Sequence, residues 1–387
     1  MAKPPVYLDH QATTPVDPRV VSAMVEAFDL FGNPHGRQHA YGRAAADAVD
    51  VARSRVAELV GAYPEQIVFT SGATESCNVA LRGAARAASP ERRRIVTLAT
   101  EHAAVLATVE DLGQQGFETI VLPVKSDGLL DFDRLKDAID DRTLIVSVMA
   151  VNNEIGVIQP LAAVASICHR HGALFHTDAT QAPARIEVDV EAWGADLMSM
   201  SSHKLYGPKG VGALYVADDV LLRPIVTGGG QERGLRSGTV PTALVCGFGV
   251  AADLVAAERP AEAERMAALA TTLRAGIEAL SADVHYFGSL DARAPGTLSF
   301  GFHGISGDKL VAMVEAEIAI STGAACASGS AAVSHVLAAL ECGRPVASTG
   351  VRVGLGRFTT KEEVDVALRA FSRVVRVAVS KRSRLCE

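Results

Sequence analysis

The sequence predicts an α/β protein with a mainly parallel sheet, followed by a smaller α+β unit. Apolar strands alternate with helices of about 10–15 residues, which is typical of βαβ units. The strands are near-continuous apolar runs, as expected where helices cover both faces of a parallel sheet. The apolar pattern of the sequence is then interrupted at 258–265 by the charged, proline-containing segment ERPAEAER. With 387 residues, of which 49% are hydrophobic and 21% charged, the chain is long enough for two or three domain-sized units.

The elements of the first unit follow from residue spacing. A short helix is predicted at 19–28, and a longer one begins at Ala44 and ends at Gly61. The predicted parallel strands are 66–70, 94–100, 117–124, 143–151, 173–179 and 196–202. The predicted helices between them are 75–88, 101–116, 131–140 and 161–172. The run at 210–216, GVGALYV, is expected to be an antiparallel partner strand.

The second unit is predicted to begin near Glu258. Two helices, 242–258 and 266–280, are expected on either side of the charged segment. The remainder alternates as strand, strand, helix, strand, helix, strand and helix, a smaller α+β arrangement. Thr360 and Glu363 have the spacing of a capping box for the last helix.

Composition narrows the class of function. The formal net charge is -7 and no long basic run occurs, so no nucleic-acid partner is expected. The first residues lack the apolar core of a signal peptide, and no run of about 18 apolar residues predicts a membrane span. The six cysteines are widely spaced without a C-x-x-C pair, which favours reduced thiols and disfavours structural zinc. We therefore expect a cytoplasmic protein.

Lys204 lies where a predicted strand becomes a loop, in SMSSHKLYGPKG. The Gly-Pro turn that follows would hold its amine in a fixed place. Taken alone, the window also fits a solvent-exposed lysine after an edge strand, because most lysines are solvated.

Two further strand ends carry candidate groups. FTSGATES at 69–76 passes from a strand through Ser71–Thr74 into a helix, whose N-terminus suits a phosphate, although an ordinary N-cap turn has the same residues. Asp178 ends another apolar strand, where a carboxylate needs a cation such as a protonated ring nitrogen or an arginine. Gln181 follows one turn later, and His102 begins a helix after a strand, suited either to stacking on a ring or to the surface.

The combination points to pyridoxal phosphate. That cofactor needs a lysine for its Schiff base, a carboxylate for its pyridinium nitrogen and an anion site for its phosphate. All three candidates follow apolar strands, so they can meet at one edge of the sheet.

Two residues of the second unit are candidates for substrate chemistry. Cys326 lies in STGAACASGSAAVSH among glycine, alanine and serine, which favours an accessible nucleophilic thiol. The cysteines in or beside apolar helical segments are interpreted as packing thiols: Cys77, Cys168, Cys246 and Cys342. Arg352 lies inside an apolar strand and fits a clamp on an amino-acid carboxylate. The glycine-rich segment 228–239 is expected to form a lid or an arm toward a second subunit.

The chain resembles the cysteine desulfurases of the class V aminotransferase family, which are fold-type I pyridoxal-phosphate enzymes. The resemblance runs in order from about Tyr7 to Thr360. The motifs that carry it are LDHQATTP, GNPHGRQH, FTSGATES, TEHAAV, VNNEIGVIQP, HTDATQ, SMSSHKLYGPKG, GGGQERGLRSGT, the Cys326 segment and VRVGLGRFTT. It implies a seven-stranded, mainly parallel sheet covered by helices in a large domain of residues 14–258. It also implies a small domain of residues 1–13 and 259–387, with the cysteine loop at about 321–333.

The resemblance also implies roles around the cofactor. Lys204 would form the Schiff base and take the α-proton of the substrate, Asp178 would pair with the pyridine nitrogen, Gln181 with the ring hydroxyl, and His102 would stack on the ring and act in catalysis. The implied phosphate contacts are Ala73, Thr74, Ser201, His203 and, on the other subunit of a homodimer, Thr239.

The implied substrate is L-cysteine. Asn153 and Arg352, together with Asn33, would hold its carboxylate, and Cys326 would take its sulfur as a persulfide and release L-alanine. The sulfur would pass to an acceptor protein such as an iron–sulfur scaffold. No metal site is expected, except that Cys326 could transiently ligate a nascent cluster.

Alternatives remain at this point. A selenocysteine lyase or a cystine C–S lyase would use the same scaffold, and a non-catalytic sulfur-transfer component would keep the fold alone. The LDHQATTP motif has His10 and Gln11 where many relatives have other residues, so an effect on the edge of the substrate pocket is expected.

Overall fold

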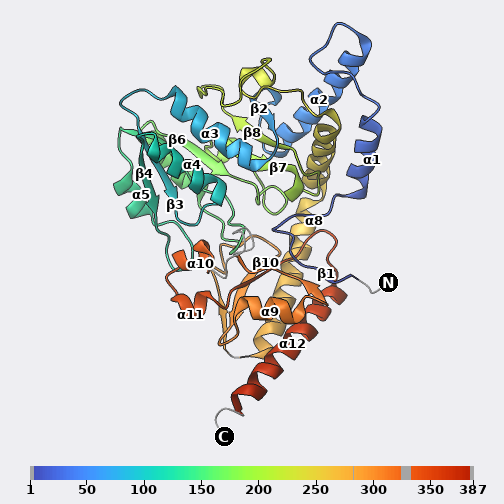
Figure 1. Ribbon diagram of the computed structural model, residues 1–387, viewed down its shortest axis with the longest axis vertical. Coiled ribbons are helices and arrows are strands. Elements are labelled where there is room, and N and C mark those ends of the chain that lie inside the picture. The colour runs from blue at the N-terminus through green and yellow to red at the C-terminus, as the bar shows by residue number, and fades with distance from the viewer. Residues whose placement is uncertain (1–3, 282, 324–332, 384–387) are drawn as a thin grey trace.

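A seven-stranded sheet forms the centre of the larger part of the molecule. The computed structural model describes residues 4–281, 283–323 and 333–383 (Figure 1). The strand order is β2-β8-β7-β6-β5-β3-β4, and β8 is antiparallel to both neighbours, whereas the other adjacent pairs are parallel. The strands are β2 (Ile67–Thr70), β3 (Arg94–Leu98), β4 (Glu118–Leu122), β5 (Thr143–Ser147), β6 (Leu174–Asp178), β7 (Leu197–Ser201) and β8 (Gly212–Val216). The predicted sheet, including its antiparallel strand, is confirmed.

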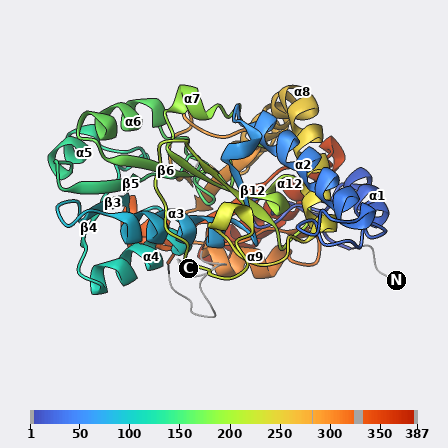
Figure 2. The ribbon, with the colours of Figure 1, turned by 90° about the horizontal axis from the view of Figure 1, so that it is seen from above.

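Helices cover both faces of this sheet (Figure 2). The helices that connect the strands are α3 (Ala73–Ala87), α4 (Ala103–Gln114), α5 (Phe132–Ala138), α6 (Leu161–Arg170) and α7 (Val190–Trp193). Successive strand residues point to opposite faces. In β3, Ile95 packs in the core cluster with Val105 and Leu112 of α4, whereas Val96 packs in the cluster with Val164 of α6. The apolar runs are therefore buried on both sides, as their sequence predicts.

A helical layer flanks the β2 end of the sheet. It consists of α1 (Pro18–Ala27), α2 (Ala40–Leu59) and the first part of α8 (Thr242–Leu280). The helix predicted from Ala44 begins four residues earlier, because the ring of His39 accepts the Gly42 N–H as an N-cap. It ends before Gly61, whose φ of 69° is the left-handed conformation that glycine favours.

One helix, α8, stands in place of the two helices predicted at 242–258 and 266–280. It runs without interruption through Pro260 and joins the upper and lower parts of the molecule (Figure 1). A proline inside a helix removes one backbone hydrogen bond. Ion pairs on both sides of Pro260 anchor the helix here: Glu258 pairs with Arg19 at 2.5 Å and Glu262 with Arg357 at 2.6 Å.

The second part of the chain has its own sheet and core. Its strands are β9 (Val284–Tyr286), β10 (Thr297–Phe302) and β12 (Val351–Gly354), all antiparallel, with a separate parallel pair formed by β1 (Val6–Tyr7) and β11 (Ile318–Ala319). Its helices are α9 (Gly307–Val314), α10 (His335–Ala339), α11 (Arg344–Ala347) and α12 (Lys361–Ser383). Phe300 lies 5.5 Å, between ring centroids, from both Phe302 and Phe371 in the core.

The capping box of α12 forms as predicted. The Thr360 N–H donates to the Glu363 carboxylate at 3.0 Å, and the Glu363 N–H donates to the Thr360 hydroxyl at 3.3 Å. Within the described ranges, no helix combines the length and apolar character needed to cross a membrane.

Candidate active site

A cavity of about 470 Å³ opens where the carboxyl ends of the parallel strands meet. Its walls come from the N-terminal segment, the start of α3, the ends of β6 and β7, and β12 of the second sheet. It gathers most of the residues predicted from sequence: Ala73, Thr74, His102, Asn153, Asp178, Gln181, Ser201, His203, Lys204 and Arg352. A second cavity, of about 520 Å³, contains none of these residues, so its size does not make it the better candidate.

Lys204 ends a single 3-10 turn, η2 (Ser202–Lys204), directly after β7. Its Nζ donates to the backbone carbonyl of Ala12 at 2.7 Å and to that of Gln11. The side chain is therefore directed into the cavity beside the N-terminal segment, which excludes the solvent-exposed interpretation of the sequence window.

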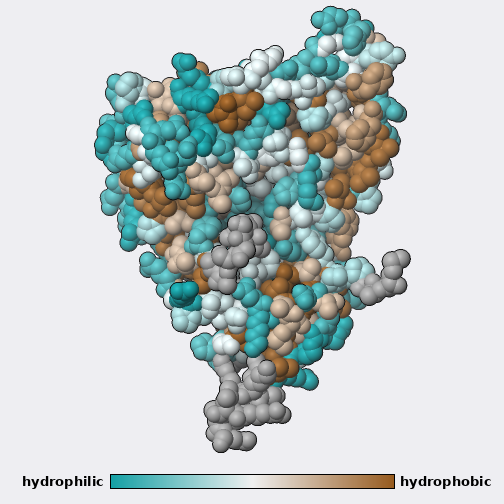
Figure 3. Space-filling model, viewed as in Figure 1, coloured by the Kyte–Doolittle hydropathy of each residue, from teal (hydrophilic) through white to brown (hydrophobic). Residues whose placement is uncertain are grey.

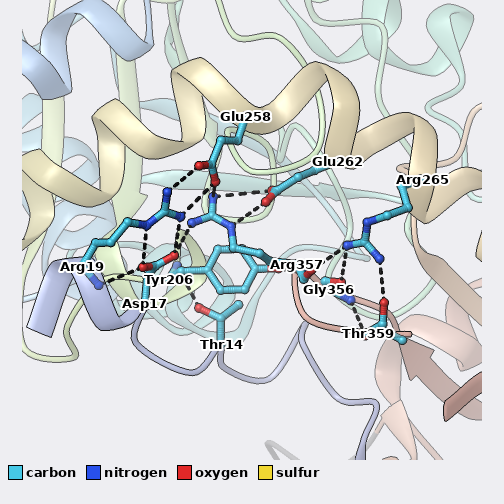
Figure 4. Close-up of polar contacts among 10 residues, drawn as sticks. All are labelled: Thr14, Asp17, Arg19, Tyr206, Glu258, Glu262, Arg265, Gly356, Arg357 and Thr359. Atoms are coloured by element: carbon cyan, nitrogen blue, oxygen red, sulfur yellow. Dashed lines mark hydrogen bonds and ion pairs between the residues drawn. The ribbon is translucent and has the colours of Figure 1, made fainter. Parts of the chain in front are cut away.

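The turn after Lys204 is held by Tyr206, a non-glycine residue with a φ of 62°. Its N–H donates to the Thr14 hydroxyl at 2.9 Å, and its phenol oxygen accepts the Arg357 backbone N–H at 2.6 Å. The Arg357 guanidinium lies 4.5 Å from the Tyr206 ring centroid and pairs with Asp17 at 2.8 Å (Figure 4). Hydrogen bonds from Arg19 above all, with Arg357 in addition, hold the pKa of Asp17 well below its usual range. This buried cluster fixes the loop that presents Lys204.

The start of α3 forms a cradle for an anion. Gly72 is its N-cap residue, and within the described part of the chain no side chain caps this helix. Gly212 of β8 approaches so closely that a Cβ there would lie 2.6 Å from the Gly72 Cα. Uncapped N–H groups at the start of a 15-residue helix attract a phosphate. The Thr74 hydroxyl and Ser201 line the same cavity.

His203 is neutral near pH 7. Burial, together with the neighbouring charges of Lys204 and Lys209, lowers its pKa to about 4. Its Nδ1 lies 3.0 Å from the Thr13 hydroxyl. The ring can therefore make a hydrogen bond in the cavity without adding a positive charge beside Lys204.

Asp178 provides a buried carboxylate at the end of β6, with 5% of its surface exposed. Its Oδ1 accepts the Thr180 N–H at 2.9 Å. Gln181 also borders the cavity and donates from Nε2 to the Gln11 carbonyl at 2.9 Å. A lysine amine, a buried carboxylate and an anion cradle in one cavity fit pyridoxal phosphate as a donor set.

His102 caps α4 at the wall of the cavity. Its Nδ1 accepts the Ala104 N–H at 3.1 Å, so a neutral ring carries its proton on Nε2. The neighbouring residue Glu101 is fully buried, and burial raises the pKa of its carboxyl well above the usual value. Glu101 Oε1 accepts the Met149 N–H at 2.6 Å.

Arg352 reaches the cavity from β12. It is 3% exposed, and its Nη2 donates to Asp9 Oδ1 at 2.7 Å, whereas its Nη1 donates to the Asn153 carbonyl at 2.8 Å. The His10 ring packs against Gly356, and its Nδ1 lies 2.9 Å from the Gly354 carbonyl. Gln11, which lines the cavity, donates from its side-chain Nε2 to the Thr297 hydroxyl at 2.6 Å. The Gln11 carbonyl contacts Lys204, so Gln11 reaches the edge of the pocket through its backbone.

Two predicted residues lie outside this cavity. Asn33 is exposed, and its side chain accepts the His35 N–H at 3.0 Å within its own turn. Thr239 is also exposed. The segments that carry Asn33 and Thr239 border the second cavity, which His35 and Val240 line. Cys326 lies outside the described residues, whereas Cys77 and Cys168 are buried, in keeping with packing thiols.

Three acidic residues beside the cavity were missed from the sequence. Asp9 pairs with Arg352, Glu101 adjoins His102, and the Glu154 carboxylate accepts the Ser334 hydroxyl at 2.5 Å. Each lies in one of the motifs that carry the family resemblance, and its charge close to a predicted site residue is the sequence signal that identifies it.

Comparisons with known proteins agree with this geometry. The model of the aminotransferase class-V family matches residues 6–367. "Cysteine desulfurase IscS" of Rickettsia rickettsii (strain Iowa) is 45% identical over 94% of this chain and 89% of its own length. The mitochondrial cysteine desulfurase of Arabidopsis thaliana is 47% identical over 94% of this chain and 81% of its own length. A solved structure described as a NifS-like protein superposes with a TM-score of 0.91 at 36% identity, covering 96% of this chain and all of that one.

Proposed function

The chain belongs to the class-V aminotransferase family and is a pyridoxal-phosphate-dependent cysteine desulfurase, and from this premise we propose which of its residues perform the reaction. The observation that carries the assignment is the single cavity that brings Lys204, Asp178 and Arg352 together from three distant parts of the sequence. The reaction removes sulfur from L-cysteine and leaves L-alanine. The relatives described above are named as desulfurases, so the lyase alternatives are not favoured.

The cofactor would be held at both of its ends. Lys204 would bind it covalently, and the N–H groups at Ala73 and Thr74, together with Ser201 and His203, would receive its phosphate. A neutral His203 suits this role because its ring can make a hydrogen bond to the phosphate without adding a positive charge beside Lys204. The bound cofactor supplies an electron sink that makes loss of the substrate α-proton feasible.

Other side chains keep the cofactor oriented. Asp178 would accept a hydrogen bond from the protonated pyridine nitrogen, and its negative charge would keep that nitrogen protonated. Gln181 would contact the ring hydroxyl, and His102 would stack on the ring; both side chains line the cavity. The Lys204 amine, once the substrate amine has replaced it, would take the α-proton, since it is directed into the same cavity.

The substrate carboxylate would bind Arg352 with Asn153. A guanidinium offers two parallel N–H groups to a carboxylate, which fixes the amino acid in one orientation. The Cys326 thiolate then attacks the substrate sulfur: an S–S bond forms, the C–S bond breaks, and its electron pair stays on the carbon, which takes a proton to give L-alanine. The resulting Cys326 persulfide is donated to an acceptor such as an iron–sulfur scaffold protein.

We also propose a cytoplasmic homodimer. Exposed apolar side chains gather on the side of the molecule where α1 lies, where Val25 is 62% and Phe28 67% exposed (Figure 3). In the dimer, Thr239 would reach the phosphate site of the partner, and Asn33 would complete the substrate site. The division into domains of 14–258 and of 1–13 with 259–387 belongs to the same proposal. Light scattering tests the dimer, since one chain has a mass of 40.4 kDa.

Two variants test the chemistry. Lys204→Ala should lose the absorbance at about 400 nm that a lysine-bound cofactor gives. Cys326→Ala should retain this absorbance and still cleave selenocysteine, but form no persulfide and release no sulfide from L-cysteine. If Cys326→Ala released sulfide from L-cysteine at the parental rate, Cys326 would not be the sulfur acceptor.

A further inference from the structure

Arg352 has partners that the expected substrate set does not include. Two of its nitrogens are occupied, Nη2 by Asp9 Oδ1 at 2.7 Å and Nη1 by the Asn153 carbonyl at 2.8 Å. Its Nε is buried and has no hydrogen-bond partner among the residues that the structure describes. Arg352 also borders the cavity, so its guanidinium lies beside the space where a substrate would lie.

Asp9 has supports besides its ion pair with the Arg352 guanidinium. The Ser321 hydroxyl donates to the same Oδ1 at 3.0 Å, and the Asp9 backbone forms a parallel bridge with Gly354. The Tyr7 phenol donates to the Asp9 carbonyl at 3.1 Å and to the Thr13 carbonyl at 2.8 Å. A carboxylate with these constraints is a fixed support for the guanidinium.

The backbone around Arg352 adds to this arrangement. The Arg352 N–H donates to the Ser321 carbonyl at 2.7 Å, so the residue that supports Asp9 also pairs with the strand that carries Arg352. Asp9, Ser321 and Arg352 thus form a closed triangle from three segments: the N-terminal segment, the residues after β11, and β12.

Donor counting shows that Asp9 and a substrate carboxylate can bind together. A guanidinium has five N–H groups. Asp9 and the Asn153 carbonyl use one N–H on each Nη, which leaves a second N–H on each Nη besides the buried one on Nε. A carboxylate that binds in a bidentate way needs two N–H groups. The Asp9 interaction is therefore compatible with an occupied substrate site.

We propose that Asp9 is a positioning residue that orients Arg352 toward the substrate carboxylate. This inference rests on the proposed role of Arg352 in binding that carboxylate. Without the charge of Asp9, the buried guanidinium loses its ionic partner and can turn toward another acceptor. The opposite model makes Asp9 a competitor that occupies Arg352 and must be displaced. The two models predict changes of opposite sign in substrate affinity.

The experiment compares Asp9→Asn with the parental holoenzyme. L-alanine, the carboxylate-bearing product, is titrated against the cofactor absorbance, and ethylamine, which has the same carbon chain without the carboxylate, is titrated in parallel. Asp9→Asn should weaken L-alanine binding by about tenfold, the lower end of the effect of a charge-assisted hydrogen bond, because Asp9 is partly exposed. Ethylamine binding should not change. KM for L-cysteine should rise in proportion, with kcat nearly unchanged.

Matched variants complete the test. Asp9→Glu should restore part of the affinity, and Ser321→Ala should weaken L-alanine binding in the same direction but less, which keeps the test open if Asp9→Asn fails to fold. Asp291→Asn, which changes an exposed aspartate outside the cavity, should have no effect.

Each possible outcome decides between the models. Unchanged or tighter L-alanine binding by Asp9→Asn, or an equal loss for ethylamine, overturns the positioning role. The variant Arg352→Gln tests the carboxylate site separately from the role of Asp9. If Arg352→Gln weakens L-alanine binding but Asp9→Asn does not, only the role of Asp9 is wrong. If Arg352→Gln has no effect, the proposed carboxylate site and the role of Asp9 are both wrong.

Discussion

Replacing Gly212 with alanine should weaken cofactor binding, although Gly212 itself contributes no side chain. The new Cβ would lie 2.5 Å from the Met200 carbonyl oxygen and 2.6 Å from the Gly72 Cα. Non-bonded carbon atoms prefer separations of about 3.5–4.0 Å, so the backbone at Gly72 must move by about 1 Å. Gly72 is the N-cap of α3, and its displacement distorts the proposed phosphate cradle.

The size of the expected loss of cofactor affinity follows from the contacts that the substitution disturbs. Overpacking of this kind typically costs about 1–3 kcal/mol of folding free energy. A displaced cradle also loses the alignment of N–H groups with a charged phosphate, and one such hydrogen bond contributes about 2 kcal/mol. We therefore expect the dissociation constant of pyridoxal phosphate to rise by roughly 30-fold.

The assay is a titration of the apoprotein with pyridoxal phosphate, combined with thermal unfolding with and without the cofactor. Gly249→Ala is a matched control, because its Cβ would lie 2.6 Å from the Ala52 Cα, in the contact between α2 and α8 and outside the cavity. Both variants should lower the melting temperature of the apoprotein, but only Gly212→Ala should lose affinity for the cofactor. Equal affinities in the two variants would show that the cradle does not bind the phosphate.

Two further predictions concern stability. Arg357→Gln removes one of the two arginine partners of the buried Asp17 and the ion-pair partner of the half-buried Glu262. Since Arg19 still pairs with Asp17, the variant should destabilise the protein by about 1.5–3 kcal/mol, measured by urea unfolding; a loss below about 1 kcal/mol would mean that the cluster in Figure 4 is not a structural support. Burial lowers the pKa of His176 to about 4, below its ordinary value of 6.5, so in this pH range the unfolded chain binds more protons than the folded chain. The stability of the apoprotein should therefore fall as the pH drops from 6.5 to about 4, and His176→Gln should reduce this slope by at most about 1.4 kcal/mol per pH unit. An identical slope in the variant would show that His176 is not neutral in the folded chain.

The sequence alone located the main parts of the candidate site because strand ends are encoded locally. Lys204 and Asp178 each follow a short apolar run, and the Ser71–Thr74 turn joins a strand to a helix. The carboxyl ends of parallel strands lie at one edge of a sheet, so such residues must be neighbours whatever the details of packing. Local pattern failed at Pro260, where it predicted a break, because the tertiary ion pairs that hold α8 together involve residues far away in the chain.

What the sequence by itself determined was therefore the layered α/β fold, the strand ends that carry the lysine and the carboxylate, and, through long motifs, the class of reaction. Only the tertiary structure decided which partners these groups have. The pair between Asp9 and Arg352 joins residues 343 positions apart, and the neutral state of His203 depends on burial beside Lys204 and Lys209. The physical reason is that backbone conformation responds to the spacing of neighbouring residues, whereas the charge and orientation of a buried side chain are set by whichever distant segments pack around it.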